Sequence, residues 1–489
     1  MPAKTLTKSK FISGLQCSKL LWVLVNDKKR IPAPSPDLQK IFDAGNEVGK
    51  LAKKRFPGGV DVPEDDYAGN KEATKKLLAD RKIIYEAGVQ SGRLFSRADI
   101  LVPVEEDAWD IVEVKSSTSV KDVYIADVAF QKHCYVKAGI KIRRACLMHV
   151  NNQYVRQGDI DVEQFFHIED ISDLVEEYSE GIEERIEELL LYIDKKACPD
   201  GCISTHCLKP YACALMCECG PHIEKGSIFQ LFKAHNEKRY DLYHKNIRVI
   251  TDIPADVRLT DNQEIQKWCI ANEKPHIHKD RIKNFLDTLK YPLYYMDFET
   301  IFPIIPLFDN SRPAQQIPFQ YSLHIIRKEG DHPEHISYLA QGDADPRMEF
   351  YKSLKSVLGD NGTVIVYHKG FEEARLTELA DITGDAEWTQ SVISRIVDLI
   401  VPFRQFDYHH PDQCGRYSIK VVLPVLTGIR YDNLAIADGG MASCSFENVV
   451  KGLITGDALI KLRNDLEEYC GLDTEGMIWI VDALKKLCK

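Results

Sequence analysis

The stretch YPLYYMDFETI, residues 291–301, sets an energetic problem that points to the fold. Its aromatic and aliphatic side chains are typical of a buried strand, yet it contains two carboxylates, Asp297 and Glu299. A carboxylate removed from water costs several kcal/mol unless a cation pairs with it or coordinates it. Two of them in one strand require a compensating partner. If that partner is a metal ion, further carboxylates are expected later in the chain.

Two later segments supply carboxylates in compatible positions. Residues 364–376, VIVYHKGFEEARL, read as a strand that turns into a helix, with Glu372 at the junction. Residues 467–477, EEYCGLDTEGM, place Tyr469 and Asp473 at positions i and i+4, on one face of a helix. Because hard divalent cations prefer oxygen ligands, the set indicates a metal site.

This order of motifs resembles the DEDD 3′–5′ exonucleases of the RNase H-like fold, in the subtype whose last motif is Tyr-x-x-x-Asp. Asp297 and Glu299 match the first motif, and Tyr469 with Asp473 matches the third. At the second motif Glu372 stands where an aspartate is usual, which keeps the charge and lengthens the side chain by one methylene. The resemblance implies two-metal hydrolysis with Mg²⁺ or Mn²⁺ bound by Asp297, Glu299 and Asp473. Glu372 would support the second ion, and Tyr469 would orient the attacking water.

A second acidic set lies nearer the N-terminus. RADILVPV (97–104) and DIVEVKSST (110–118) read as strands that carry Asp99, Glu113 and Lys115. Glu113 and Lys115 share one face, because side chains alternate along a strand. Two carboxylates and a lysine suit metal-assisted phosphodiester cleavage. The carboxylates would hold Mg²⁺ or Mn²⁺, while the ammonium orients the attacking water and stabilises the developing charge.

The ordered pattern Asp…Glu-x-Lys…Gln-x-x-x-Tyr resembles the RecB-like branch of the PD-(D/E)XK nucleases. The two carboxylates and the lysine just named match its metal-binding core. Gln131 and Tyr135, four residues apart in the next predicted helix, match the motif that follows. Glu47 lies in an upstream helix where many relatives have a histidine or glutamate, and it is a further candidate metal ligand.

Cysteines concentrate in the segment HCLKPYACALMCEC. Cys207, Cys213 and Cys219 stand there at six-residue steps, and Cys217 is an alternative to Cys219. Three close thiolates need a fourth to complete a tetrahedral metal site or to hold an iron–sulfur cluster, and Cys17 is the candidate.

Some RecB-like nucleases carry a [4Fe–4S] cluster in this layout, with one early cysteine and three late ones. The resemblance implies such a cluster here, fastening the two ends of the domain together. Zinc is the alternative metal.

The composition is that of a globular protein, with 44% hydrophobic and 28% charged residues, and 489 residues suggest two or more domains. No window approaches the roughly 18 apolar residues of a membrane span. The N-terminal stretch has polar interruptions and no small-residue cleavage site, so a signal peptide is not expected. Fourteen cysteines without such a signal predict a cytoplasmic protein whose clustered cysteines bind a metal.

The charge is unevenly distributed, although the net charge is −11. Residues 1–55 hold twelve Lys and Arg against four Asp and Glu. A basic face of this kind can hold a phosphate backbone, so a nucleic acid is the expected partner, with DNA favoured over RNA. A membrane partner is not expected, and the sequence identifies no protein partner.

The motifs together predict an α/β protein of two domains. Residues 1–221 form the RecB-like PD-(D/E)XK nuclease domain with the cysteine cluster, 222–290 a helical connector, and 291–489 the RNase H-like DEDD exonuclease domain. This joined layout resembles an uncharacterised bacterial family, on phrases such as RPAQQIPFQYSLHI and YSIKVVLPVL. In that reading Gln315, Gln320 and His324 line the nucleic-acid groove.

The expected function is a divalent-metal-dependent nuclease whose C-terminal domain is a 3′–5′ exonuclease. Three alternatives stay open: a nucleic-acid-binding regulator with one or both centres inactive, an RNA-directed exonuclease, and a phosphodiesterase for small nucleotides. The regulator stays an alternative because Glu372 stands where an aspartate is usual at the second motif.

Overall fold

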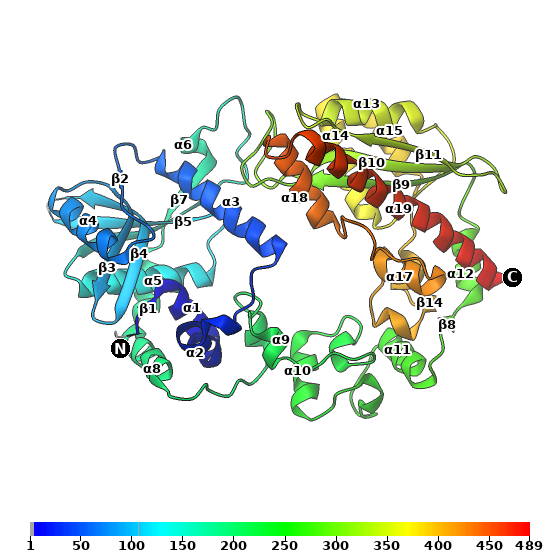
Figure 1. Ribbon diagram of the computed structural model, residues 1–489. Helices are drawn as coiled ribbons and strands as arrows, with labels where there is room; N and C mark the ends of the chain where they lie inside the picture. The colour runs from blue at the N-terminus through cyan, green and yellow to red at the C-terminus, as the bar shows by residue number, and fades with distance from the viewer. Residues whose placement is uncertain (1–3, 106) are drawn as a thin grey trace. The chain divides into compact units, whose positions relative to one another are not determined.

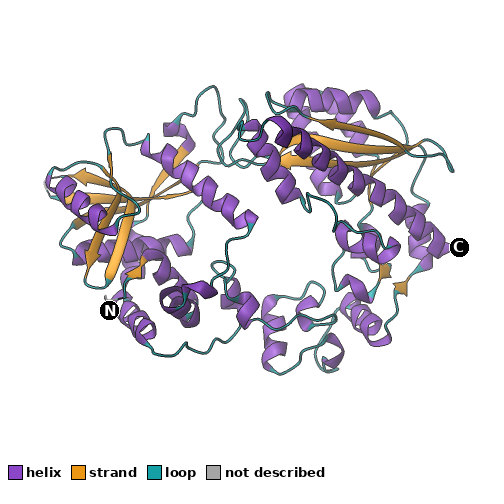
Figure 2. Cartoon of the chain, viewed as in Figure 1, coloured by secondary structure: helices purple, strands orange, loops and turns teal. Residues whose placement is uncertain are grey.

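The computed structural model describes residues 4–105 and 107–489, and it is a mixed α/β protein of two compact units (Figures 1 and 2). Unit 1 comprises Met1–Pro221 and Ile304–Ala314, and unit 2 comprises His222–Pro303 and Gln315–Lys489. The predicted α/β class is therefore confirmed. The first predicted boundary, at residue 221, coincides with the end of the first unit, whereas the predicted connector 222–290 clusters with unit 2.

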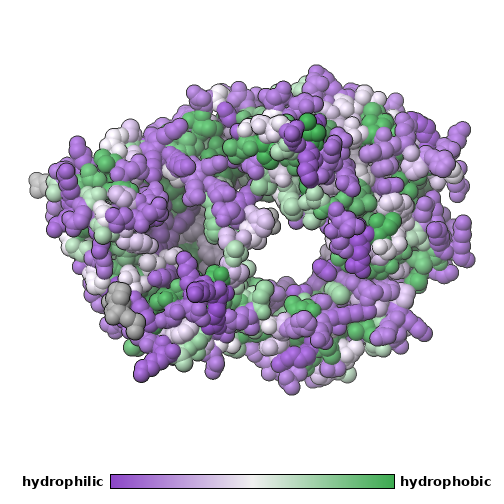
Figure 3. Space-filling view, viewed as in Figure 1, coloured by the Kyte–Doolittle hydropathy of each residue, from purple (hydrophilic) through white to green (hydrophobic). Residues whose placement is uncertain are grey.

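Hydrophilic residues cover most of the visible surface of both units in Figure 3. None of the helices in the described ranges combines the length and the apolar character needed to cross a bilayer.

Unit 1 is built on a seven-stranded sheet in the order β2-β3-β4-β5-β6-β7, with the short β1 pairing in parallel with β4. Antiparallel pairing joins β3, β4 and β5, and β5 pairs in parallel with β6. The strands are β1 Leu6–Thr7, β2 Val60–Asp61, β3 Ile84–Ser91, β4 Leu94–Val104, β5 Ala108–Lys115, β6 Lys141–Val150 and β7 Phe166–Asp170.

Helices cover both faces of this sheet. One face packs against α5, with Phe130 and Cys134 in a large apolar cluster, and the other packs against α3 through Val48 and Ala52. The helices are α1 Lys8–Gln16, α2 Ser18–Asn26, η1 Lys28–Arg30, α3 Pro36–Lys53, α4 Tyr67–Ala79, α5 Asp122–Lys137, α6 Val162–Phe165, α7 Ser172–Ser179, α8 Ile182–Asp194, η2 Thr205–Leu208 and α9 Met216–Cys219.

The excursion Ile304–Ala314 belongs to unit 1 although the chain on either side of it belongs to unit 2. Arg156 fixes it: the guanidinium donates to the carbonyls of Pro306 and Leu307, both at 2.8 Å, and the Arg156 main chain pairs with Asn310 and Ser311. No sequence pattern predicts this excursion, because main-chain carbonyls accept the hydrogen bonds of Arg156 whatever side chains those residues carry.

Unit 2 contains a five-stranded sheet in the order β11-β10-β9-β12-β13. The central β9 pairs antiparallel with β10 and parallel with β12, and a long C-terminal helix, α19, lies along the sheet (Figure 1). The strands are β9 Leu293–Ile301, β10 Ile317–Ile326, β11 Glu334–Leu339, β12 Thr363–Val366 and β13 Ile396–Asp398, and a separate pair is β8 His276–Ile277 with β14 Tyr408–His409.

The remaining elements of unit 2 are mostly short helices. Those in the predicted connector have an apolar cluster of their own, which includes Ile228, Leu231 and Ile250. The helices are η3 Ile228–Gln230, α10 Asn236–His244, η4 Ile250–Asp252, α11 Asp261–Asn272, α12 Lys279–Leu286, α13 Arg347–Val357, α14 Lys369–Thr383, α15 Ala386–Ile393, α16 Val401–Arg404, η5 Pro411–Gln413, α17 Ile419–Thr427, α18 Gly439–Val450 and α19 Gly456–Cys488.

Tyr135 fills an opening between β3 and β4. The strand register pairs Ala87 with Ala98 but skips Glu86 and Asp99, which have no register partner in this pair of strands. The backbone of Glu86 has a φ of +58°. The buried Tyr135 hydroxyl donates to the Ala87 carbonyl and accepts the Ala98 N–H at 3.1 Å. The tyrosine of the Gln-x-x-x-Tyr pattern therefore holds the strands in place next to Asp99.

Replacing Tyr135 with phenylalanine should lower the free energy of unfolding of unit 1. The Ala87 carbonyl and the Ala98 N–H would both lose their partner in a buried place, which costs about 1–3 kcal/mol. Chemical denaturation measures the loss, with the exposed Tyr67→Phe as the matched control. Equal stability of the Tyr135→Phe and Tyr67→Phe variants would contradict this role.

Candidate functional site

In unit 2, the carboxylates of β9 face away from the apolar core of the sheet. Tyr294, Met296 and Phe298 pack into that core, so the alternation of a strand directs Asp297 and Glu299 to the opposite face. The same face receives α19, which contacts β9.

The helix α19 brings the predicted third motif to these carboxylates. The thiol of Cys470 lies 3.8 Å from Asp297 Oδ2. Ligand atoms of Asp297, Glu299 and Cys470 all lie within 4.8 Å of one another. Asp473 Oδ1 accepts a hydrogen bond of 2.5 Å from the Tyr431 hydroxyl. The structure thus brings together residues that are more than 170 positions apart in the chain.

Burial raises the pKa of every carboxylate in this cluster, and the charge of neighbouring carboxylates adds to the effect at Asp297 and Glu299. Burial, and then the charge of Asp473, raises the pKa of Asp297 well above its ordinary value, and burial with Asp297 and Asp473 does the same for Glu299. Burial raises the pKa of Asp473 to about 6, although hydrogen bonds from Tyr431 and Tyr469 and the charge of Lys420 lower it. Ionising this cluster without a bound cation is therefore unfavourable.

Glu372 lies in the first turn of α14 and is buried. Its Oε2 has no hydrogen-bond partner in the described part of the chain, and burial followed by the charges of Asp297 and Asp398 raises its pKa well above the ordinary value. An orphaned, buried acceptor beside Asp297 is suited to a cation or a metal-bound water.

Asp398 has a structural role beside Glu372. Its Oδ1 accepts the N–H groups of His368, at 3.1 Å, and Ile400, at 3.2 Å. His368 has a φ of +110° and precedes α14, so Asp398 fixes the turn that presents Glu372.

The predicted groove residues on β10 have other partners. Gln320 is fully buried, and its amide donates to the Leu466 carbonyl of α19 at 2.9 Å. His324 lies 2.8 Å from the Thr474 hydroxyl. Gln320 therefore lines no groove in the described structure, because α19 covers it, whereas His324 lines a pocket of about 330 Å³ together with His335. Gln315 lies just before β10.

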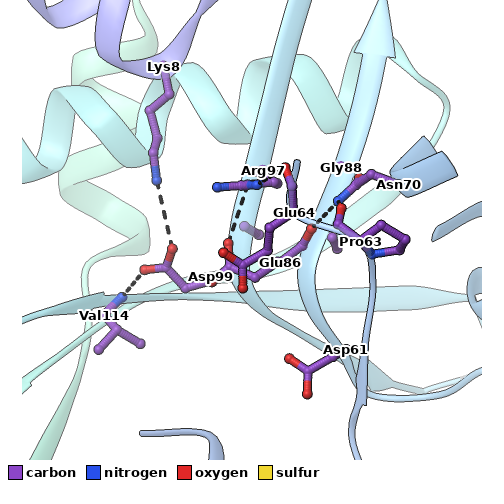
Figure 4. Close-up of polar contacts among 12 residues, drawn as sticks. Lys8, Asp61, Pro63, Glu64, Asn70, Glu86, Gly88, Arg97, Asp99 and Val114 are labelled. Atoms are coloured by element: carbon purple, nitrogen blue, oxygen red, sulfur yellow. Dashed lines mark hydrogen bonds and ion pairs between the residues drawn. The ribbon is translucent and has the colours of Figure 1, made fainter. Parts of the chain in front are cut away.

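In unit 1, a cavity of about 690 Å³ opens over the strands of the predicted N-terminal motif. One wall is α3, and the other is formed by β3, β4 and β5. Figure 4 shows Lys8 and the Val114 main chain directed at Asp99, and Arg97 beside Glu86. Four lysines, one arginine and four carboxylates line the cavity, a mixture suited to a phosphate chain and a metal cation.

The predicted triad is together at the base of this cavity. Lys115 Nζ lies 2.6 Å from Glu113 Oε1 and 2.7 Å from Asp127 Oδ2. Asp99 Oδ2 accepts the Val114 N–H at 2.7 Å. Lys8, at the start of α1, lies 2.8 Å from Glu113 and 4.0 Å from Asp99. Lys8 therefore lies between the two carboxylates that were predicted to bind a metal.

Lys8 and Lys115 lower the pKa of Glu113 and of Asp99, but only Glu113 ends below its ordinary value. Although burial raises it, the pKa of Glu113 is held well below its ordinary value by Lys115 and Lys8. Burial, and then the charge of Glu113, raises the pKa of Asp99 to about 6 against the opposing effect of both lysines. Burial and Asp99 likewise raise the pKa of Glu86 to about 7.

The other predicted residues of unit 1 lie as follows. The Gln131 amide donates to Glu113 Oε2 at 2.6 Å and so orients that carboxylate. Glu47 lies on α3, but it is not among the residues that line the cavity in the described structure, where Glu64 and Glu86 supply the additional carboxylates.

The cysteines predicted to hold a cluster converge on one small cavity. Cys17, between α1 and α2, lines it together with the buried Cys207 and Cys213 and with Cys219, and Cys202 lines it as well. Burial and neighbouring thiols raise the pKa of Cys207 and Cys213. Cys217 is exposed and does not line this cavity in the described structure, which favours Cys219 as a ligand. Thiols converging from both ends of unit 1 fit a metal or cluster ligand set.

Several functional residues escaped the sequence reasoning. In unit 1 these are Lys8 and Asp127, and in unit 2 they are Lys420, Tyr431 and Cys470. Asp127 could have been predicted from the sequence, because it precedes Gln131 by four residues and so lies on the same face of the helix.

Comparison with known proteins adds the following similarities. A family described as a domain of unknown function (DUF2779) matches residues 294–418, which include Asp297, Glu299 and Glu372. The chain is 26% identical over 252 residues to the uncharacterized protein MG366 of Mycoplasma genitalium, covering 46% of this chain and 36% of that protein. It is 28% identical over 222 residues to the uncharacterized protein UU173 of Ureaplasma parvum, covering 41% of this chain and 32% of that protein.

The matched region thus spans about a third of the length of these relatives. Among solved structures, an alkaline exonuclease from Laribacter hongkongensis matches with a TM-score of 0.23 and 12% identity, covering 39% of this chain and 90% of that chain.

Asp473→Asn should stabilise the metal-free protein at neutral pH. Since the pKa of Asp473 is raised to about 6, its folded form binds the proton more tightly than the unfolded chain does. The resulting stability is full below the unfolded pKa and is lost as the pH rises through about 6. At about pH 7.5 the variant should exceed the wild type by on the order of 3 kcal/mol, from a shift of about two pKa units. Denaturation with a chelator present measures this.

The exposed Asp482→Asn, on the same helix, is the control and should match the wild type. Adding Mn²⁺ should stabilise the wild type more than Asp473→Asn. A destabilised Asp473→Asn variant, with a pH dependence like that of the wild type, would contradict the raised pKa of Asp473.

Lys8→Met should raise the Mn²⁺ affinity of unit 1. The Lys8 ammonium lies against Glu113 and near Asp99, so removing its charge leaves the carboxylates less neutralised. The expected gain is roughly tenfold, which corresponds to about 1.4 kcal/mol. Electron paramagnetic resonance titration of Mn²⁺, performed in an Asp297→Asn background, measures it. Lys10→Met on the same helix is the control, and an unchanged or weaker affinity for Lys8→Met would count against the assignment.

Proposed function

We propose that the protein is a divalent-metal-dependent nuclease that hydrolyses the phosphodiesters of DNA, with a 3′–5′ exonuclease centre in unit 2 and a RecB-like centre in unit 1. One observation carries the proposal. Asp297, Glu299, Glu372 and Asp473 are grouped at the end of a sheet at a high electrostatic cost, and within the described residues they form no ion pair. Divalent cations offset that cost, and two such cations are the ordinary means of cleaving a phosphodiester.

The side chains of the unit 2 centre have distinct parts in this chemistry. Asp297, Glu299 and Asp473 would hold Mg²⁺ or Mn²⁺, with Glu372 in support. The bound ions supply charge stabilisation and a nucleophilic hydroxide. Burial and the neighbouring charge of Asp473 raise the pKa of Tyr469 well above its ordinary value, so its O–H donates to Asp473 while the oxygen can accept a hydrogen bond from the attacking water. Lys420 lies 4.9 Å from the Tyr469 ring centroid, where its charge can receive a substrate phosphate.

The unit 1 centre uses the same chemistry with a lysine added. Asp99 and Glu113 would hold the cation, and Glu47 is retained as a further candidate ligand. Lys115 keeps its proton because Glu113 and Asp127 outweigh the effect of burial, and its ammonium can therefore stabilise the charge that develops on a phosphate. Gln131 fixes the orientation of Glu113.

The cysteine cavity is proposed to hold a [4Fe–4S] cluster through Cys17, Cys207, Cys213 and Cys219, with zinc as the alternative. The support is the convergence of these thiols on one cavity. Such a ligand set would tie the start of unit 1 to its end and so stabilise the fold around the nuclease centre. The visible spectrum of the anaerobically purified protein decides between iron–sulfur and zinc, since only the former is coloured.

The activity itself is tested with end-labelled single-stranded and double-stranded DNA and RNA in the presence of Mg²⁺ or Mn²⁺. Asp297→Asn should abolish 3′-end trimming, lowering the rate by roughly a hundredfold or more. Lys115→Ala should remove the activity of unit 1, and the double variant should be inactive. Asp482→Asn and Lys10→Ala are the matched surface controls.

Each outcome separates the alternatives. Faster cleavage of RNA than of DNA would replace DNA with RNA as the substrate. Binding of nucleic acid without hydrolysis by the wild type would favour the regulator. Cleavage of small nucleotides alone would favour the phosphodiesterase. If all three variants degrade the substrates like the wild type, the nuclease proposal is wrong.

A further inference from the structure

A third group of ligand-type side chains lies in unit 1, away from the carboxylates already described. His149 is near the end of β6, and His167 and Glu169 are on β7. His149 and His167 are direct cross-strand partners, and Glu169 follows His167 by two residues, so all three side chains share one face of the sheet. His149 is buried, whereas the other two are exposed.

The three side chains are close enough to share one ion. One ligand atom from each, an imidazole nitrogen or a carboxylate oxygen, lies within 4.8 Å of the other two. His149 Nε2 is 3.7 Å from Glu169 Oε2, and the two imidazole rings are 5.2 Å apart, inclined at 50° rather than stacked flat. Small rotations of the exposed His167 and Glu169 side chains bring the three atoms to the spacing of a common coordination sphere.

A main-chain contact prepares His149 as a ligand. Its Nδ1 lies 3.2 Å from the Val150 carbonyl oxygen. In the tautomer that donates Nδ1–H to this carbonyl, Nε2 carries the lone pair and faces Glu169. Metal-binding histidines are usually oriented by a hydrogen bond of this kind on the other ring nitrogen.

We propose that His149, His167 and Glu169 form a zinc site that fastens β7 to β6. Two imidazoles and one carboxylate are ligands that Zn²⁺ accepts readily, whereas Mg²⁺ favours oxygen ligands throughout. A tetrahedral Zn²⁺ with three protein ligands keeps its fourth position for water. A metal at this position would stabilise the edge of the sheet, because β7 is the last strand in the sheet order and pairs with β6. A metal bridge resists the fraying of such an edge.

The zinc site does not depend on the proposed nuclease activity. It lies close to the unit 1 centre, because β6 pairs with the strand that carries Glu113 and Lys115. His149 is the register partner of Lys115 in the parallel pair β5–β6. Zinc binding would therefore hold the end of β6 beside the strand that carries Glu113 and Lys115.

Equilibrium dialysis of the full chain against zinc chloride tests the proposal, with excess Mg²⁺ present to occupy the carboxylate centres. His167→Ala and Glu169→Gln change exposed side chains, so both variants should fold. The wild type should bind one zinc ion per chain more than His167→Ala, and Glu169→Gln should weaken that ion's binding by at least tenfold. His133→Ala, on α5, is the matched control and should bind as the wild type does. Because the cysteines are the same in all four proteins, zinc held by thiols cancels in the comparison.

Thermal unfolding provides the second measurement. Zinc should raise the Tm of the wild type and of His133→Ala more than that of His167→Ala or Glu169→Gln. If His167→Ala and Glu169→Gln bind as much zinc as the wild type with equal affinity, the three residues are only an ion pair with a neighbouring imidazole, and the proposal is overturned.

Discussion

The burial of carboxylates at the ends of two sheets is the constraint on which the rest of this structure depends. Removing a carboxylate from water is costly, and it persists in a folded protein only where a cation or a proton offsets the cost. Unit 1 meets the constraint with its own side chains, since Lys8 and Lys115 both contact Glu113. In unit 2 the compensating groups within the described residues are the hydroxyl of Tyr431 and the charge of Lys420, and they leave the pKa of Asp473 raised to about 6.

The two proposed centres therefore differ in how a cation would bind to them. The unit 1 carboxylates are largely neutralised before any metal binds, so an incoming cation competes with an ammonium group already in place. The unit 2 carboxylates have raised pKa values instead, so cation binding there displaces protons and its affinity depends on pH. Glu372 belongs to this second arrangement, because its Oε2 has no hydrogen-bond partner among the described residues, and burial and the charges of Asp297 and Asp398 raise its pKa.

Much of the scaffold around each centre holds ligands rather than contacting substrate. Tyr135 bridges β3 and β4 beside Asp99, Gln131 orients Glu113, and Asp398 fixes the turn before α14. Such groups make a site rigid, and rigidity is what allows carboxylates of like charge to stay close together until a cation arrives.

The sequence predicted the α/β class, and the resemblance to known nucleases predicted most of the residues that meet in each cluster. Spacing along strands and helices accounts only for the pairs that share a face, such as Asp297 with Glu299. Lys8 was missed since it reaches Glu113 from a helix 105 residues away, with no motif around it. Tyr431 and Lys420 were missed for the same reason: loop and helix packing, rather than periodicity, brings them to Asp473. Gln320 was misassigned because an amide on a strand can face either a groove or a covering helix, and only the position of α19 decides.

The most direct test of the account is crystallographic: Mn²⁺ soaked into crystals of the full chain, with anomalous scattering used to locate the metal. The account predicts manganese between Asp297, Glu299, Glu372 and Asp473, and a further ion between Asp99 and Glu113 with the Lys8 side chain displaced. Crystals that take up no manganese at Asp297, with the four carboxylates protonated and hydrogen-bonded to one another, would contradict it.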